Sequence, residues 1–163
     1  MKPRIDFTKY YGSGLAQAML GLEKQVEASG LEPGLMELVK VRVSQMNGCA
    51  YCIDMHTKDA RALGETEQRI YALSAWHETP FFSDRERAAL EYAEAVTRVG
   101  ETHVPDEVWA RVRQQFSEDE LVSLTFALVT INGWNRLAVA FRIPPGTYQP
   151  QRATAPSQQH VSA

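Results

Sequence analysis

The feature that most constrains the fold of this chain is a succession of helix-start and helix-stop signals with no alternating strand pattern between them. Apolar residues recur every three or four positions, which is the period of an amphipathic helix. Ser83-Asp84-Arg85-Glu86 and Ser117-Glu118-Asp119-Glu120 are both capping boxes, in which the serine and glutamate side chains satisfy free backbone amides at a helix start. We therefore predict an all-α fold, a helical bundle without significant β-sheet.

The signals divide the chain into a helical domain and a tail. Helices are predicted over Leu15–Ser29, Pro33–Met46, from near Cys49 to before Gly64, over Thr66–Trp76, after Ser83, from Pro105, and from Ser117 to about Phe141. The last of them is apolar nearly all round through 121–131, which is typical of a central helix or a subunit interface. We predict one domain over residues 1–145 and a flexible tail over 146–163, because the tail holds few large apolar groups.

The charge of the chain argues against several partners. The formal net charge is -3 and no basic stripe is present, so we expect neither a nucleic-acid nor a membrane partner. The N-terminus lacks the apolar stretch of a signal peptide, so a cytoplasmic location is expected. In that compartment a pair of cysteines is more often catalytic or metal-binding than a permanent disulfide.

The only two cysteines form a C-x-x-C pair, Cys49 and Cys52, followed by His56. If a helix begins at Cys49, the three side chains project from one face, and the free amides of the first turn lower thiol pKa values. Cys52 and His56 then lie one turn apart. His56 could accept the proton of Cys52 and later supply a proton to a leaving oxygen.

A carboxylate is predicted to complete this site. The turn at Asn47-Gly48 joins two helices that should pack as an antiparallel hairpin. Reflecting His56 through that turn places it near Glu37, which could orient the imidazole and raise its basicity.

Other readings of the cysteine pair remain open at this point. It could be structural, it could belong to a dithiol redox sensor, or it could bind zinc through Cys49, Cys52, His56 and one further ligand, His77 or His103. Neither of these two histidines lies in a second compact ligand pair, so the zinc signal is weak. We expect no cofactor and no metal.

Glu37, eleven intervening residues and Cys49-x-x-Cys52-x-x-x-His56 resemble the core motif of the AhpD-like alkylhydroperoxidase family, within the carboxymuconolactone decarboxylase superfamily. The stretch 47–56 is similar to the short members with a single core repeat. The resemblance extends to 83–97 and 131–136, and so covers most of residues 10–145.

The resemblance implies an all-helical fold that assembles as trimers or hexamers, and a thiol peroxidase cycle. Cys52 would be the peroxidatic cysteine, His56 its proton partner and Glu37 the start of the proton relay. Cys49 would resolve the sulfenic acid as a disulfide. An external dithiol, carried by a lipoyl-bearing or thioredoxin-like protein, would reduce that disulfide.

One residue departs from the family pattern. Prototype AhpD proteins carry a second histidine directly before the peroxidatic cysteine, where this chain has Tyr51, so the resemblance implies a shortened relay. A tyrosine donates hydrogen bonds but is a poor base at neutral pH. The superfamily name also suggests a lyase acting on a muconolactone-type ring acid, a chemistry that needs no dithiol.

Five further residues have structural interpretations. We expect core or interface positions for the tryptophans rather than a place in a pocket wall, and structural hydrogen bonds for the two asparagines of the last helix. These residues are Trp76, Trp109, Trp134, Asn132 and Asn135.

Overall fold

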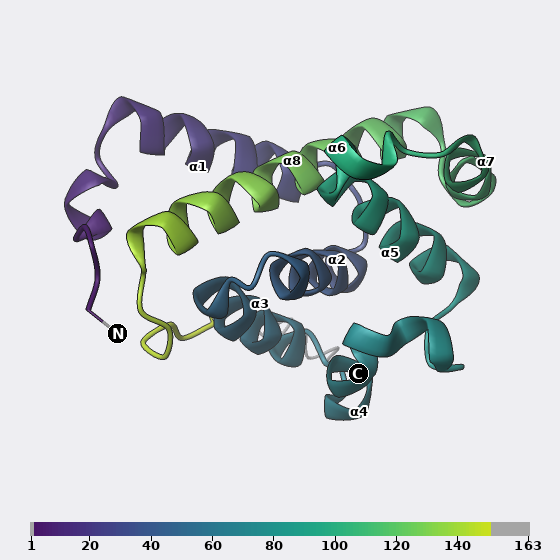
Figure 1. Ribbon diagram of the computed structural model, residues 1–163, viewed down its shortest axis with the longest axis horizontal. Coiled ribbons are helices and arrows are strands. Elements are labelled where there is room, and N and C mark those ends of the chain that lie inside the picture. The colour runs from purple at the N-terminus through teal and green to yellow at the C-terminus, as the bar shows by residue number, and fades with distance from the viewer. Residues whose placement is uncertain (1, 151–163) are drawn as a thin grey trace, which may run out of the picture.

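The computed structural model describes residues 2–150, and within them all regular structure is helical, as predicted. The elements, shown in Figure 1, are the 3₁₀ helix η1 (Phe7–Tyr10), α1 (Gly14–Glu27), α2 (Pro33–Met46), α3 (Ala50–Ala62), α4 (Glu67–Ala72), the 3₁₀ helix η2 (Leu73–Glu78), α5 (Asp84–Thr97), α6 (Val99–Thr102), α7 (Asp106–Gln115) and α8 (Glu118–Phe141). Among these residues no helix combines the length and apolar composition that a membrane crossing requires.

The helix starts follow the capping signals in the sequence. Both predicted capping boxes form, with Ser83 accepting from the Glu86 amide at α5 and Ser117 accepting from the Glu120 amide at α8. The prediction over Thr66–Trp76 was partly wrong, because α4 ends at Ala72 and the chain continues as the 3₁₀ helix η2. Its break is at Ala75, whose φ of -122° and ψ of 33° are not helical.

Helix α2 is the centre of the fold and packs against α3, α5 and α8. Figure 1 shows it enclosed, with α8 crossing above it and α3 and α5 to either side. Its apolar side chains Val39, Val41 and Val43 have no exposed surface at all. Because α2 is covered on nearly all sides, its polar residues are also buried, and each of them needs a partner.

The turn between α2 and α3 brings the two helices together as the predicted hairpin. Gly48 adopts a φ of 65°, a left-handed conformation that costs glycine little. The Asn47 side chain donates to the side-chain oxygens of Asn132 (3.0 Å) and Asn135 (2.9 Å) on α8. Asn135 in turn donates to Ser44 Oγ of α2 at 3.1 Å. The expected structural bonds of the two asparagines are thus present, and they fix the turn to α8.

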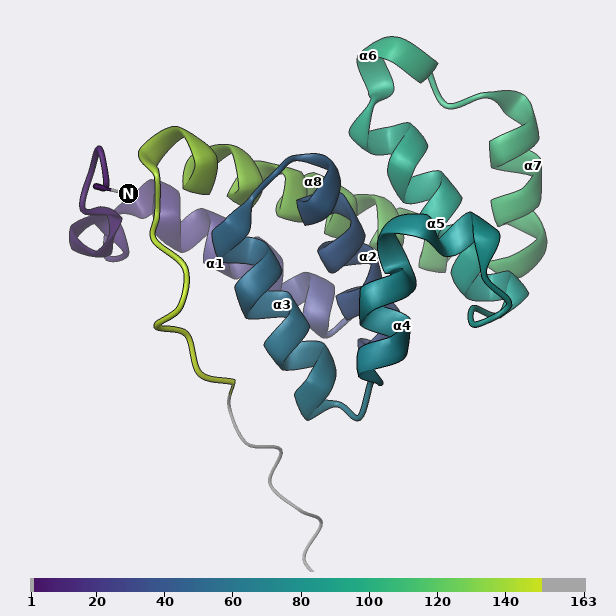
Figure 2. The ribbon, with the colours of Figure 1, turned by 60° about the horizontal axis from the view of Figure 1, so that its bottom comes forward.

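The segment after α8 lies along α3 rather than leaving the domain (Figure 2). The Gly146 amide donates to Asp54 Oδ2 (3.0 Å), Lys58 donates to the Tyr148 carbonyl (3.0 Å), and the Tyr148 hydroxyl donates to Asp59 Oδ1 (2.7 Å). Of the predicted flexible tail over 146–163, residues 146–150 are thus in contact with α3, and the flexibility of the tail stays a prediction. Its remainder, 151–163, lies outside the described residues.

Candidate functional site

The two cysteines lie at the start of α3. Cys49 is the N-cap residue, and its sulfur accepts a hydrogen bond from the Cys52 amide at 3.4 Å. Both thiols are free, and each residue is about 1% exposed. Helix α3 thus directs an unpaired amide of its first turn toward Cys49, the residue that precedes the helix, an arrangement that stabilises negative charge on the Cys49 sulfur.

The surroundings separate the pKa values of the two thiols. The hydrogen bond from the Cys52 thiol, supported by backbone amides and the Asn135 side chain, lowers the pKa of Cys49 to about 7 against the opposing effect of burial. The pKa of Cys52 is raised, first because its thiol hydrogen-bonds to Cys49 and second because it is buried. In the reduced pair the negative charge therefore rests on Cys49 and the remaining proton on Cys52.

Glu37 and His56 are in direct contact, as the hairpin argument predicted. His56 Nδ1 lies 2.8 Å from Glu37 Oε2, and both residues are buried. Lys40, one turn along α2, lies 3.4 Å from Glu37 and 2.8 Å from Glu23. Burial works to raise the pKa of Glu37, but the hydrogen bond and charge of His56, together with Lys40, outweigh it and hold that pKa below its usual range. The carboxylate is therefore ionised and fixes the imidazole through Nδ1, which leaves Nε2 for chemistry.

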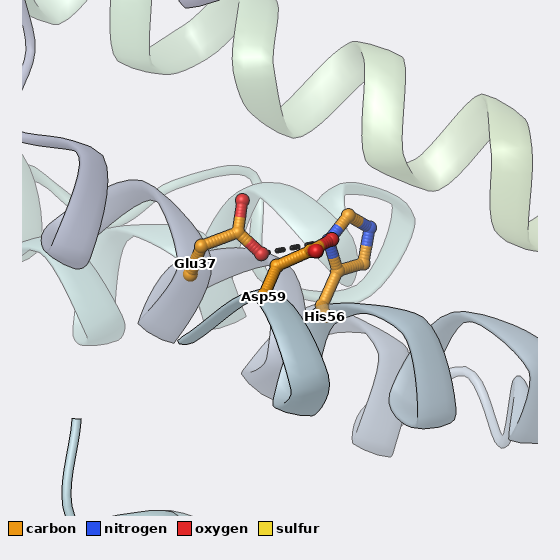
Figure 3. Close-up of side chains that lie close together, drawn as sticks. All are labelled: Glu37, His56 and Asp59. Carbon is orange, nitrogen blue, oxygen red and sulfur yellow. Dashed lines mark hydrogen bonds and ion pairs between the residues drawn. The ribbon is translucent and has the colours of Figure 1, made fainter. Parts of the chain in front are cut away.

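Asp59 extends this group by one turn of α3 (Figure 3). Burial raises the pKa of its carboxyl group, the hydrogen bond from Tyr148 lowers it, and the nearby Glu37 charge raises it further. One ligand atom from each of Glu37, His56 and Asp59 can be chosen so that all lie within 4.8 Å of one another. Two carboxylates and an imidazole at that spacing could hold a divalent metal ion, although the Lys40 ammonium competes with it for Glu37.

A cavity of about 260 Å³ lies over these residues. Cys52, His56 and Glu37 line it, together with aromatic side chains that include Tyr51 and Trp134. Trp134 is thus part of a pocket wall, contrary to the expectation of a core or interface position. Trp76 is buried as expected, whereas Trp109 is 45% exposed.

Cys49 does not line this cavity. It lines a separate groove of about 560 Å³ on the far side of Tyr51, bounded by the end of α8 and the segment that follows it. The structure thus places Glu37, His56 and Cys52 at one cavity and Cys49 at the other side of a shared wall. Burial raises the pKa of Tyr51 to about 12, so this residue is a hydrogen-bond donor and not a base at neutral pH.

Sequence reasoning missed four residues of the site: Lys40, Asp59, Asn135 and Tyr148. Lys40 follows Glu37 by three positions and Asp59 follows His56 by three, so helical spacing alone could have placed them beside the predicted residues. Asn135 was given only structural bonds, yet its amide also lowers the pKa of both thiols. Tyr148 carries no local signal, because its place depends on the fold of the segment after α8.

Comparison with known proteins identifies the family to which the chain belongs. The model of the carboxymuconolactone decarboxylase family matches residues 14–95. The uncharacterized protein YdfG of Bacillus subtilis is 46% identical over 140 residues, which span 86% of this chain and 95% of that protein. The uncharacterized protein YnjA of Escherichia coli is 34% identical over 116 residues, which span 71% of this chain and 63% of that protein.

A solved structure resembles the whole fold. A protein of unknown function from Agrobacterium tumefaciens, suggested to be the antioxidant defence protein AhpD, superposes with a TM-score of 0.86 at 41% identity. The match covers 90% of this chain and 100% of that one.

Proposed function

Because this chain belongs to the carboxymuconolactone decarboxylase family, and within that superfamily to the AhpD-like proteins, we propose that it is a thiol peroxidase. It reduces organic or hydrogen peroxide through a dithiol–disulfide cycle of Cys52 and Cys49. The observation that carries the proposal is the cavity that Cys52 lines together with the hydrogen-bonded Glu37–His56 pair. A nucleophilic sulfur and an oriented proton carrier in one cavity are what peroxide reduction needs.

The first step is oxidation of Cys52. The thiol gives up its proton, either to Cys49 along the S–H···S contact or to His56, and the Cys52 thiolate attacks one peroxide oxygen. The S–O bond forms as the O–O bond breaks, and the leaving oxygen takes a proton from the imidazolium of His56. The products are a sulfenic acid at Cys52 and an alcohol, or water when the substrate is hydrogen peroxide.

The second step joins the two sulfurs. Any proton that Cys49 received in the first step passes to the neutral imidazole of His56. The Cys49 thiolate attacks the sulfur of the Cys52 sulfenic acid, and the S–S bond forms as the S–O bond breaks. The leaving hydroxide takes a proton from His56 or from solvent and becomes water. Because the pKa of Cys49 is only about 7, the attacking thiolate is abundant at neutral pH. An external dithiol then donates two electrons to the disulfide and restores both thiols. Overall, one peroxide and one dithiol give an alcohol, water and one external disulfide.

The negative charge on Cys49 has a role in the first step as well. Since the Cys52 thiol is hydrogen-bonded to Cys49, the pair shares one proton in the pH range between its first and its second ionisation. Peroxide entering the cavity meets Cys52 and not Cys49, so access selects the attacking sulfur. Glu37 acts as a positioning residue, because its carboxylate holds the ring of His56 and stabilises the imidazolium.

The test is peroxide consumption with dihydrolipoate as the electron donor, for the wild type, Cys52→Ser and Cys49→Ser. Cys52→Ser is expected to abolish turnover. Cys49→Ser is expected to stop after one oxidation, with a sulfenic acid at Cys52 that dimedone traps for mass spectrometry. Equal activity in the three proteins would show that the cysteines do not carry the reaction.

A second candidate, binding of a divalent metal ion, is favoured by the cluster of Glu37, His56 and Asp59. Carboxylate and imidazole donors suit Zn²⁺, Mn²⁺ and Fe²⁺. A protein purified without chelator and carrying one metal per chain, lost in Asp59→Asn, would support this function. Metal-free protein whose melting temperature does not respond to Zn²⁺ would exclude it.

A further inference from the structure

We propose that the dithiol reductant reaches the disulfide from the side opposite to the peroxide cavity, by docking as an anion in the groove over Cys49, between Arg4 and Arg142. This inference rests on the proposed function, and it names the surface and the sulfur that the reductant uses. Two observations support it, namely which cysteine lines which hollow and the charge of each hollow, together with the in-line direction of attack that a disulfide requires.

The two hollows lie on opposite sides of one wall. Tyr51, Ala138 and Ile143 line both the peroxide cavity and the groove. Cys52 lines only the cavity, and Cys49 lines only the groove. Each cysteine of the pair therefore borders its own hollow.

The charges of the two hollows are opposite. Among the described residues 2–150, the cavity is lined by Lys40, with no other lysine or arginine, and by four carboxylate residues: Glu23, Glu27, Glu37 and Asp59. The groove is lined by Arg4 and Arg142, and no acidic residue of the same range lines it. The nucleophile in disulfide reduction is a thiolate, which an acidic cavity repels and an arginine-lined groove attracts. A neutral peroxide is indifferent to that difference.

Both arginines are placed for recognition of an anion. They are exposed, and neither forms an ion pair with another residue in the described part of the chain. Arg4 is fixed at the end of α8, since its side chain donates to the Ala140 carbonyl (3.1 Å) and its amide to the Phe141 carbonyl (2.9 Å). The remaining lining is largely apolar, with Val139, Ile143, Pro144 and Pro145. The occupant that fits is a dithiol on an apolar chain that carries a nearby negative charge.

The stereochemistry of disulfide exchange selects Cys49. The attacking sulfur, the attacked sulfur and the leaving sulfur lie nearly in line, so an attack on Cys49 must come from the side away from Cys52. A reductant in the groove meets Cys49 and not Cys52, because Cys49 lines the groove and Cys52 does not, so the groove is the hollow from which Cys49 is attacked. An attack on Cys52 would come instead from the acidic cavity.

Reduction of the Cys49–Cys52 disulfide by a dithiol takes two steps. The reductant thiolate forms a bond to the Cys49 sulfur while the Cys49–Cys52 bond breaks, and Cys52 leaves as a thiolate that His56 can protonate. The second thiol of the reductant, after loss of its proton, attacks the reductant sulfur in the mixed disulfide. Cys49 then leaves as a thiolate and the reductant closes as a disulfide. The pKa of about 7 makes Cys49 a good leaving group in this second step, since a more acidic thiol leaves faster.

The first experiment locates the mixed disulfide. The Cys49–Cys52 disulfide is formed with diamide, so the result does not depend on peroxidase activity. The oxidised wild-type protein then reacts briefly with the monothiol 3-mercaptopropionate, is quenched with acid and alkylated, and is sequenced by tandem mass spectrometry. We expect the adduct on Cys49. An adduct mainly on Cys52 would overturn the inference and leave the proposed peroxidase function untouched.

The second experiment tests the arginines with two reductants that differ in one charge, dihydrolipoate and the neutral dihydrolipoamide. Reduction of the diamide-formed disulfide is timed for the wild type, Arg4→Gln, Arg142→Gln and the control Arg98→Gln, an exposed arginine that lines neither hollow. Each groove variant is expected to slow dihydrolipoate by about two- to fivefold, the size of an exposed ion-pair interaction. Dihydrolipoamide and the control should be unchanged.

Two results would contradict the docking surface. An equal slowing of both reductants would show that the arginines do not recognise a negative charge. Unchanged reduction with an altered oligomeric state in the groove variants would assign the groove to a second copy of this chain. Loss of peroxide turnover in a protein that still shows the charge preference would refute the proposed function alone.

Discussion

Cys49 and Cys52 lie three residues apart, yet each holds a property that the other lacks. Cys49 carries the negative charge because it accepts hydrogen bonds at the start of α3. Cys52 lies beside the proposed peroxide cavity, which it lines together with His56. Neither cysteine alone has both a low thiol pKa and a place in the cavity wall, so the proposed reaction with peroxide needs both cysteines.

A pH profile tests this coupling. Alkylation of the reduced protein by iodoacetamide should rise with pH around a midpoint near 7, since only the thiolate reacts and the Cys49 pKa is about 7. Cys52→Ala removes the main hydrogen bond that lowers this pKa, and Cys49→Ala removes the acidic thiol itself. Both variants should therefore titrate at least one pH unit higher, closer to an ordinary thiol at about 8.5. If the alkylation midpoint stays near pH 7 in either variant, the two thiols do not share a proton.

The contact between Glu37 and His56 gives a second prediction. Glu37→Gln keeps the shape of the side chain but removes the charge that stabilises the imidazolium, so peroxide reduction should fall by about tenfold or more. Stopped-flow oxidation of the reduced protein measures this rate separately from the reductant step. The control is Glu107→Gln, an exposed glutamate of α7, which should react like the wild type. If Glu37→Gln is oxidised at the wild-type rate, Glu37 takes no part in the proposed proton relay.

The residues of the site were predictable where helical geometry determines them. The contact between Glu37 and His56 follows from a tight turn at Asn47-Gly48, because the turn fixes which residues of two antiparallel helices face each other. Tyr148 was not predictable, since it reaches Asp59 only through a segment whose path depends on the finished fold. The opening of the two cysteines to separate hollows was likewise beyond the sequence, because the end of α8 forms the wall between them.

Among the elements, α8 does the most to hold the site together. Its two asparagines bind the α2–α3 turn, and Asn135 also bonds Ser44 within α2. The start of this helix was predictable from the capping box at Ser117, because a capping box is formed by residues next to each other in the sequence. No local signal marks the break of η2 at Ala75, so the sequence predicted one continuous helix over Thr66–Trp76.

The buried amide of Asn135 gives a prediction for α8. Asn135→Ala removes one of the two acceptors of the Asn47 amide and the donor to Ser44 Oγ, although Asn47 keeps Asn132 and Ser44 keeps the Lys40 carbonyl. The loss of these two buried hydrogen bonds should lower the free energy of unfolding by about 1–3 kcal/mol. Urea denaturation followed by circular dichroism measures the change. Gln114→Ala, on an exposed face of α7, should change it by less than about 0.5 kcal/mol. A similar small change for Asn135→Ala would mean that the network does not stabilise the turn.

At the scale of the whole molecule, α8 leaves an apolar face uncovered. Val122, Phe126 and Val129, at helical spacing, are each about half exposed, and they border a hollow of about 690 Å³ next to Trp109. The nearly all-round apolar pattern of this helix predicted either a central helix or an interface. One side of α8 is in the core, so we predict that the exposed side packs against a second copy of the chain.

Assembly through this face can be tested with one charge. Phe126→Glu should weaken self-association by about tenfold or more, because it places a carboxylate in an apolar contact. Light scattering after size-exclusion chromatography would show a smaller mass than for the wild type. Gln114→Glu adds the same charge outside this face and should keep the wild-type mass. A wild-type mass for both variants would place the interface elsewhere.

The Asn47-Gly48 turn also bears on how this protein ages. Asparagine before glycine is the pair most prone to deamidation, because the unhindered glycine amide can attack the asparagine side chain. Here the Gly48 amide is held by the Gln45 carbonyl at 3.2 Å, and the Asn47 side-chain nitrogen donates to both asparagines of α8. Folding therefore restrains both reacting groups. Conversion to aspartate would place a negative charge against the side-chain oxygens of Asn132 and Asn135, two residues before Cys49, so slow chemical damage at this turn would disturb the surroundings of the thiols.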